Sequence, residues 1–371
     1  MDPNDPIAQR FPLVARPRPA CPPLTERVHA LLDLARSAAE GNDPTRASAV
    51  YNQSALLASD LGLPTLARDL CYRHADAYFQ AGPLPGPSAI RALEPVVNLA
   101  RLHIRAGRGD TARQHLLTLY AAVGTSTAAQ LDSITVPAHL TATADGRREV
   151  RAWLWTVLLA DGTRALTIQG RWNDALAHIQ EHRGVGKRML DGRQVAVLAA
   201  LTGGASDHAA VLLHGTTPDE PWEQVVTACL TALCHRAAQQ TADRDVENLV
   251  SMYEALESDP GTAVFNIRLG LTILDIIEAD TSSARHVANE LHQRATKQND
   301  GYAALENLRH PRFRAHVTEE QQRECRKVLT ACALGDGKLP DELRELLRTA
   351  VSTSDHTIRR TVPDRPALPP L

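Results

Sequence analysis

The pattern His178-x-x-Glu181-His182 is the arrangement in this sequence with the clearest capacity for chemistry. Two histidines four residues apart on a helix can chelate one metal ion, and a glutamate beside them can serve as general base. On a helical wheel, however, the core side is defined by Leu176 and Ile179, and the three polar residues fall on the flank and the outer face. No third ligand follows in the sequence. We therefore predict a solvated polar helix face without a metal, with zinc catalysis as the alternative.

A basic loop follows directly. It contains Arg183, Lys187, Arg188 and Arg193, interspersed with glycines. Backbone N–H groups at the start of the next helix, together with these cations, could form an anion pocket. The phosphate-binding pattern G-x-x-x-x-G-K-[ST] is absent. The alternative is an ordinary interhelical loop with surface arginines.

A helix before these two features contains two tryptophans, Trp153 and Trp155. Because they are two residues apart, they cannot share one helix face, and we expect one in the core and the other toward a groove. Gly162 interrupts the same helix, which indicates close packing of a neighbouring helix or a ligand beside Asp161. The predicted binding groove comprises Trp153, Trp155, Asp161, Arg164, Arg183, Lys187, Arg188 and Arg193.

The elements that position these residues are helices. Aromatic residues make up only 4% of the 371, while alanine and leucine dominate, and that composition favours helices over strands. Apolar residues recur at helical spacing from residue 25 onward, in segments separated by short turns. In four turns a glycine precedes an alanine by five residues: Gly62 and Ala67, Gly107 and Ala112, Gly170 and Ala175, and Gly204 and Ala209. We expect the glycine to end one helix in a left-handed conformation and the alanine to let the next helix approach closely.

These turns resemble those of tetratricopeptide (TPR) repeats, which pair helices over about 34 residues. The resemblance covers residues 25–215, without the full aromatic consensus. It implies an all-α, right-handed TPR-like solenoid with one long inserted loop over residues 124–147. We expect a disordered proline-rich arm over 1–23, repeats over 24–215, a helical continuation over 216–351 and a disordered tail over 352–371. The insert, which contains Ile134 to Val136, is expected to form either a short β-ribbon over the neighbouring helices or a disordered loop.

Charge and cysteine usage bear on partners and location. The formal net charge is −3, which argues against a nucleic-acid partner. No run of about 18 apolar residues predicts a membrane span, and no signal peptide is recognisable. Six scattered cysteines without a C-x-x-C pair indicate buried structural thiols in a reduced, cytoplasmic protein.

The leading functional hypothesis is a cytoplasmic binding or scaffold protein that recognises a peptide or protein partner in a concave groove. The arginine-rich, lysine-poor composition suggests an actinomycete genome, and similar TPR-like proteins there regulate or assist secondary-metabolite biosynthesis. A homodimer is an open possibility, and no cofactor is expected. The alternative is a metal-independent tailoring enzyme that uses His139, His178 and His182 for acid–base chemistry.

Overall fold

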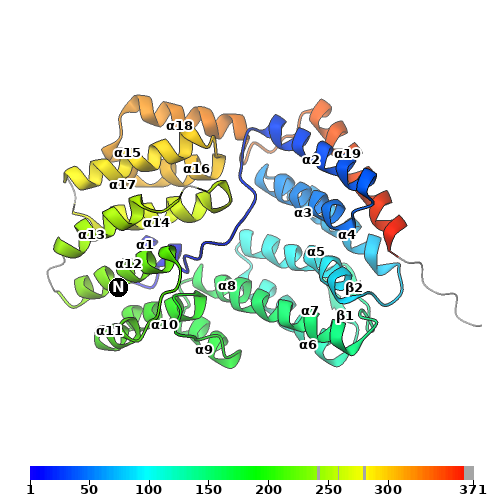
Figure 1. Ribbon diagram of the computed structural model, residues 1–371, viewed down its shortest axis with the longest axis horizontal. Helices are drawn as coiled ribbons and strands as arrows, with labels where there is room; N and C mark the ends of the chain where they lie inside the picture. The colour runs from blue at the N-terminus through cyan, green and yellow to red at the C-terminus, as the bar shows by residue number, and fades with distance from the viewer. Residues whose placement is uncertain (240–242, 258, 279–280, 363–371) are drawn as a thin grey trace, which may run out of the picture. The chain divides into compact units, whose positions relative to one another are not determined.

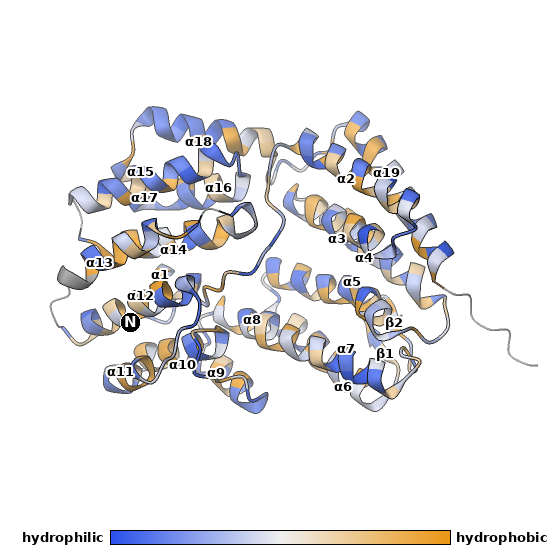
Figure 2. Cartoon of the chain, viewed as in Figure 1, coloured by the Kyte–Doolittle hydropathy of each residue, from blue (hydrophilic) through white to orange (hydrophobic). Residues whose placement is uncertain are grey.

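The computed structural model describes residues 1–239, 243–257, 259–278 and 281–362. Within these ranges the regular secondary structure is helical apart from one two-stranded hairpin (Figure 1) and an isolated β-bridge between Leu84 and Thr141. Apolar and polar residues are interleaved along most helices (Figure 2), as expected for helices that bury one side and expose the other. The predicted fold class, all-α, is confirmed.

The chain packs as two compact units, and each is discontinuous in sequence. Unit 1 is formed by Met1–Pro23 and Leu166–Cys332, and unit 2 by Leu24–Ala165 and Ala333–Leu371. The chain therefore changes unit within α8 (Thr163–Thr167). Helical periodicity reports which side of a helix is buried, but it does not report which other helix covers that side.

In unit 2, most helices pack against their neighbours in sequence, and the last helix is the exception. Helix α19 (Asp341–Thr361), red in Figure 1, lies beside α2 (Leu24–Gly41) and α3 (Pro44–Asp60). The other elements of this unit are α4 (Pro64–Phe79), α5 (Gly86–Arg105), α6 (Gly109–Thr125), β1 (Ala129–Leu131), β2 (Ile134–Val136), α7 (Ala144–Val157) and the π-helix η1 (Leu158–Gly162).

Helix α19 corrects the expectation of a disordered tail from residue 352. Its residues Leu347, Val351, Ser354 and Ile358 are buried and recur at helical spacing, so this side of the helix continues into the segment expected to be disordered. Leu347 joins one hydrophobic core with residues of α2 and α3. Residues 363–371 of the expected tail lie outside the described residues.

Unit 1 is organised around α14 (Ala263–Ile276), of which every residue except Arg268 and Asp275 is buried. The two charged residues are neutralised: Arg268 pairs with Glu306, and Asp275 with Arg10 and His310. The other helices of this unit are α1 (Pro6–Arg10), α9 (Trp172–Glu181), α10 (Asp191–Thr202), α11 (Ser206–His214), α12 (Pro221–Ala237), α13 (Asp243–Glu254), η2 (Pro260–Thr262), α15 (Ser282–Lys297), α16 (Gly301–Arg309), α17 (Pro311–His316) and α18 (Glu319–Cys332).

The first 23 residues, expected to be a disordered arm, pack along unit 1 instead. Phe11, Leu13 and Cys21 are buried. The prolines do prevent regular structure over most of the segment, but its backbone polar groups find partners elsewhere. The Gln194 amide donates to the Leu13 carbonyl (2.7 Å) and accepts from the Leu13 N–H (2.6 Å), and Asp300 accepts from the Cys21 N–H (2.8 Å).

The four predicted glycine turns are confirmed. Gly62, Gly107, Gly170 and Gly204 have φ values of 78°, 74°, 70° and 77°, in the left-handed region. The alanine five residues after each glycine is fully buried; these alanines are Ala67, Ala112, Ala175 and Ala209. The turn after α2 uses Asn42 at φ 48° instead, with Asp43 capping α3 through the backbone N–H groups of Thr45 and Arg46.

Replacing Gly107 with alanine isolates the backbone requirement of one such turn. No atom lies within 4 Å of the position that its Cβ would take, so steric contact contributes nothing. We expect the free energy of unfolding to fall by about 1–2 kcal/mol, because a left-handed conformation is unfavourable for alanine. Urea unfolding followed by circular dichroism measures it. Gly41→Ala is the matched control, since Gly41 ends α2 without a positive φ; an equal loss in both variants would contradict the explanation.

The insert over residues 124–147 contains the β-ribbon that was one of its two predicted structures. Strands β1 and β2 pair antiparallel, with Leu131 opposite Ile134. Both strands bury alternate residues, and β1 packs against α6. The tight turn between them consists of Asp132 and Ser133, with Asp132 at φ 49°, a conformation that aspartate tolerates better than most residues.

Candidate metal centre

The predicted groove residues are divided between the two units. Trp153, Trp155, Asp161 and Arg164 belong to unit 2, and Arg183, Lys187, Arg188 and Arg193 belong to unit 1. Trp153 is half-buried and Trp155 is exposed. Gly162 ends the π-helix η1, and Asp161 in it accepts two hydrogen bonds from the guanidinium of Arg101. The combined groove of both sets stays a prediction.

One cation of the basic loop, Arg188, forms ion pairs within unit 1. Arg188 pairs with the buried carboxylate of Glu223 and with Asp219. Close backbone packing also shapes the loop, because a Cβ on Gly192 would lie 2.2 Å from the carbonyl oxygen of Gly184. These contacts favour the interhelical-loop interpretation for Arg188, while Lys187 is exposed.

The outer-face prediction for His178 is wrong. His178 is 1% exposed and its ring meets that of His182 edge to face, with 4.8 Å between the centroids. The core side of α9 is set by Trp172, which is fully buried, whereas Leu176 is only half-buried. The buried direction therefore lies nearer to His178 than the wheel indicated. His139 is exposed and belongs to unit 2, so the three histidines of the enzyme alternative do not share one unit.

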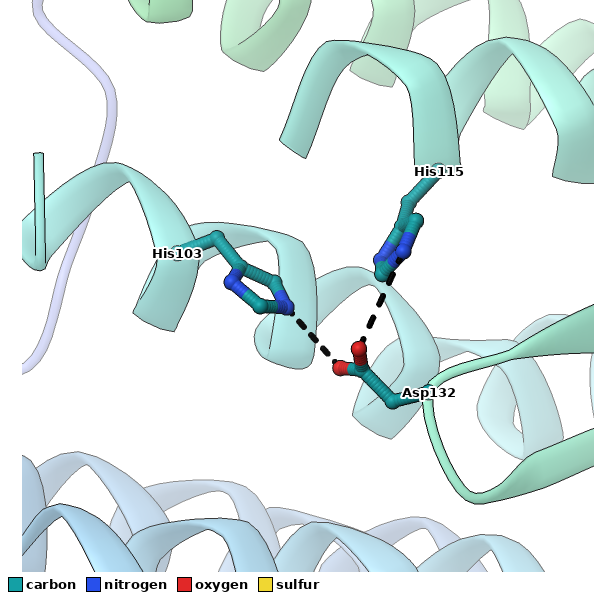
Figure 3. Close-up of side chains that lie close together, drawn as sticks. All are labelled: His103, His115 and Asp132. Atoms are coloured by element: carbon teal, nitrogen blue, oxygen red, sulfur yellow. Dashed lines mark hydrogen bonds and ion pairs between the residues drawn. The ribbon is translucent and has the colours of Figure 1, made fainter. Parts of the chain in front are cut away.

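A cluster that the sequence reasoning missed lies in unit 2. His103, His115 and Asp132 converge from three separate elements, with their side chains directed toward one another (Figure 3). His103 lies in the last turn of α5, His115 in α6 and Asp132 in the turn between β1 and β2. One ligand-type atom from each residue lies within 4.8 Å of those of the other two. Among the described residues, this is the only group of three such side chains at that spacing.

Local structure brings these residues together. The left-handed Gly107 reverses the chain between α5 and α6, which places the rings of His103 and His115 at 5.1 Å between centroids and nearly perpendicular. The β-hairpin packs on α6 and presents the Asp132 carboxylate between the two rings. The two histidines are partly buried, with 12% and 19% of their side chains exposed, whereas Asp132 lies at the exposed tip of the hairpin with 24% of its side chain exposed.

Hydrogen bonds define the tautomer of a neutral His103 ring. Arg108, the residue before α6, donates from Nε to His103 Nδ1 at 2.9 Å. Because Nδ1 accepts, the neutral ring has its proton on Nε2, which lies 2.9 Å from Asp132 Oδ2 and donates to it. The Asp132 carboxylate thus completes a relay of charge-assisted hydrogen bonds from Arg108.

The second histidine is held more loosely and is favoured in its neutral form. His115 Nε2 lies 3.8 Å from Asp132 Oδ1, beyond hydrogen-bond distance. Burial and the neighbouring His103 lower the pKa of His115 more than the Asp132 charge raises it, so the pKa lies below the usual histidine value. A neutral imidazole is the form that binds metal ions.

The donor set fits a divalent transition metal. Two imidazoles and one carboxylate suit zinc, iron(II), cobalt, nickel or manganese, with bonds of about 2.0–2.2 Å. Ligand atoms around such an ion lie roughly 3–3.5 Å apart, so the His103–Asp132 pair, at 2.9 Å, is already close to this spacing, and His115, at 3.8 Å, must move slightly inward. Binding through His103 Nε2 shifts the ring proton to Nδ1, and the exposed Arg108 side chain must then turn away.

The sequence contained only a weak signal for this cluster. The three residues are separated by 12 and 17 positions and match no ligand-spacing motif. The available clue was a histidine on each side of a predicted glycine turn, together with an aspartate in a predicted ribbon.

Within the described ranges, no helix combines the length and apolar character needed to cross a membrane. With the geometry of the cluster established, the chain was compared with known proteins. It matches no protein-family model, and no curated protein and no solved structure gave a significant match.

Proposed function

We propose that this protein is a helical-repeat binding protein that holds a divalent transition-metal ion at His103, His115 and Asp132. The observation that carries the proposal is the convergence of two partly buried histidines and one carboxylate from three separate elements of unit 2. An ion pair between His103 and Asp132 would involve only those two residues. The second histidine, His115, beside the same carboxylate is what indicates a metal site.

Such a site has both a structural and a chemical capacity. An ion bound to all three residues would link α5, α6 and the hairpin, and would stabilise unit 2 in proportion to its occupancy. Three protein ligands also leave coordination positions for water or for an oxygen or nitrogen atom of a ligand, where the ion acts as a Lewis acid. The role of the chain is to orient the two rings and to exclude bulk water from one side of the ion.

A TPR-like solenoid that recognises a peptide or protein partner remains our proposal for the role of the helical scaffold. The four left-handed glycines followed by buried alanines support it, because they are the turns expected from such repeats. A cytoplasmic location and an accessory role in secondary-metabolite biosynthesis belong to the same proposal. Metal binding at the cluster adds a site on this scaffold at which a partner or small molecule could be recognised.

Metal titration tests the site directly. Chelator-treated protein is titrated with Zn²⁺ by calorimetry and with Co²⁺ by visible absorption, which reports the ligand geometry. We expect one ion per chain, and a loss of affinity of at least about 100-fold in His103→Ala, His115→Ala and Asp132→Asn, because each variant removes a direct ligand. His139→Ala is the matched control, since His139 is an exposed histidine of the same insert.

The Arg108→Gln variant distinguishes a metal site from a hydrogen-bond relay of Arg108, His103 and Asp132 that only stabilises the fold. If the cluster binds metal, this variant should bind at least as tightly as the original chain, because the guanidinium no longer occupies His103 Nδ1. Circular dichroism of each metal-free variant confirms that it is folded. Equal affinity in the His139→Ala and His103→Ala variants, or no binding by a folded parent protein at millimolar metal, would contradict the proposal.

A further inference from the structure

Two cysteines of unit 1 lie at the places where the chain leaves this unit. Cys21 is two residues before the end of the arm at Pro23, and Cys332 is the last residue of α18. Both side chains are fully buried, and neither cysteine is part of a disulfide. They are 311 residues apart in sequence and meet over Gly301, the first residue of α16.

The environment of Gly301 shows how near the two sulfur atoms are. A Cβ built on this glycine would lie 2.8 Å from Cys332 Sγ and 3.2 Å from Cys21 Sγ, so both sulfurs border the same small space. The Cys332 thiol also donates to the carbonyl oxygen of Cys21, at 3.1 Å. Any side chain at position 301 would occupy the space between the two thiols.

The backbone around Cys21 is fixed from both sides. The N–H of Gly301 donates to the Cys21 carbonyl (2.8 Å), and the N–H of Cys21 donates to Asp300 Oδ2 (2.8 Å). The other carboxylate oxygen of Asp300 caps α16 by accepting from Ala303. A segment without regular structure is therefore held against the start of α16, and the Cys332 thiol at the end of α18 contacts its backbone at Cys21.

We propose that Cys21 and Cys332 are a redox pair that closes to a reversible disulfide, which fastens the arm to the end of α18. The co-reactant is a low-molecular-weight disulfide such as oxidised glutathione. The Cys21 thiolate attacks one sulfur of the co-reactant, which gives a mixed disulfide and releases one thiolate. The Cys332 thiolate then attacks the Cys21 sulfur and releases the second, and the two protein thiol protons pass to the two released thiolates.

Access distinguishes Cys21, the first thiol to react, from the cysteines buried within helices. Cys21 belongs to an extended segment with exposed neighbours, including Pro17 and Pro19, so a local opening of the arm is enough to expose it. The other four, Cys71, Cys229, Cys234 and Cys325, are buried within helices, and burial raises the pKa of Cys325 to about 11 and that of Cys71 to about 12. These thiols remain protonated and unreactive while the helices are intact.

Thiol mapping of the full chain tests the pair. The reduced protein is incubated with oxidised glutathione, alkylated with iodoacetamide in denaturant and digested without reductant. We expect one cross-linked peptide that joins Cys21 to Cys332, loss of two of the six alkylatable thiols, and recovery of both with dithiothreitol. The oxidised protein should also unfold at a higher urea concentration, because the bridge closes a long loop.

Single substitutions provide the controls. Cys325→Ser removes another buried thiol of α18 and should leave the cross-link unchanged. Cys21→Ser should abolish the cross-link with all remaining thiols alkylatable, whereas Cys332→Ser should abolish it and leave Cys21 as the mixed disulfide with the co-reactant. The parent protein alone decides the question if a variant fails to fold. Full alkylation of Cys21 and Cys332 after oxidation, an accumulated mixed disulfide without the bridge, or a bridge to a different cysteine would overturn the proposal.

Discussion

Replacing Trp172 with alanine is expected to lower the free energy of unfolding of unit 1 by about 3–5 kcal/mol. Trp172 is 1% exposed and is the largest of the fully buried side chains. Its removal leaves a cavity that the surrounding helices can fill only in part. Its indole N–H also donates to the Pro3 carbonyl at 3.0 Å, so the substitution removes an anchor of the arm. Urea unfolding at neutral pH measures the loss.

Trp155→Ala is the matched control for this prediction. Trp155 is 37% exposed, and we expect its removal to cost less than half as much, because less apolar surface returns to water. Hydrogen exchange adds a local readout: faster exchange of the Leu13 amide in Trp172→Ala would show that the arm has loosened. A loss below about 1 kcal/mol in Trp172→Ala would mean that this tryptophan is not the core residue that the structure shows.

The second large effect is expected from Glu223→Gln. The Glu223 carboxylate is fully buried and accepts hydrogen bonds from Arg188, from the buried Met189 N–H (3.1 Å) and from the Asp219 N–H (3.4 Å). An amide of the same shape presents an NH₂ group to donors that need an acceptor. We expect a loss of about 2–3 kcal/mol at pH 7, the range for buried hydrogen bonds to a charged group.

The same substitution has a defined pH dependence. Burial raises the pKa of Glu223, but the hydrogen bonds from Arg188 and from the Met189 and Asp219 backbone lower it further, so the folded-state pKa lies below the usual value. The stabilisation is therefore complete above the unfolded-state pKa of about 4.3 and is lost as the pH falls through the folded-state value. The difference between the parent and Glu223→Gln should shrink below about pH 4.

Glu220→Gln is the control for the pH experiment, because Glu220 is exposed on the same loop. Its unfolding should differ from that of the parent by less than about 0.5 kcal/mol at pH 7. A difference between parent and Glu223→Gln that stayed constant from pH 7 to pH 3 would show that the carboxylate charge has no part in stabilising the loop.

Local features of this fold could be predicted because their causes are local. A glycine such as Gly107 ends a helix because its own φ is positive, and Asp43 caps α3 because two N–H groups a few residues away need an acceptor. The hairpin at Asp132 follows from two short alternating segments around a turn. Each of these causes lies within a few residues of sequence.

The remaining features depend on residues far apart in sequence. The first 23 residues read as disordered because a proline-rich segment forms no ladder of its own, and nothing near it in sequence indicates that Gln194 and Asp300 complete its hydrogen bonds. For the same reason, the periodicity of α19 could not identify α2 as its neighbour. The same holds for the candidate site. The sequence around each of its three residues contains no metal-binding motif, and only their proximity in the folded chain indicates a site.

The course of the arm has a consequence for how the chain folds. Residues Arg10, Arg16 and Cys21 contact partners that lie 265, 175 and 279 residues later in the sequence. During synthesis these early residues lack their partners until most of the polypeptide has been made. The apolar side of α2 and α3 stays uncovered still longer, until α19 has been synthesised. Such high contact order predicts slow folding and apolar surfaces that stay uncovered until translation is nearly complete. The nascent chain is therefore expected to require chaperones far more than its finished units, in which these surfaces are covered.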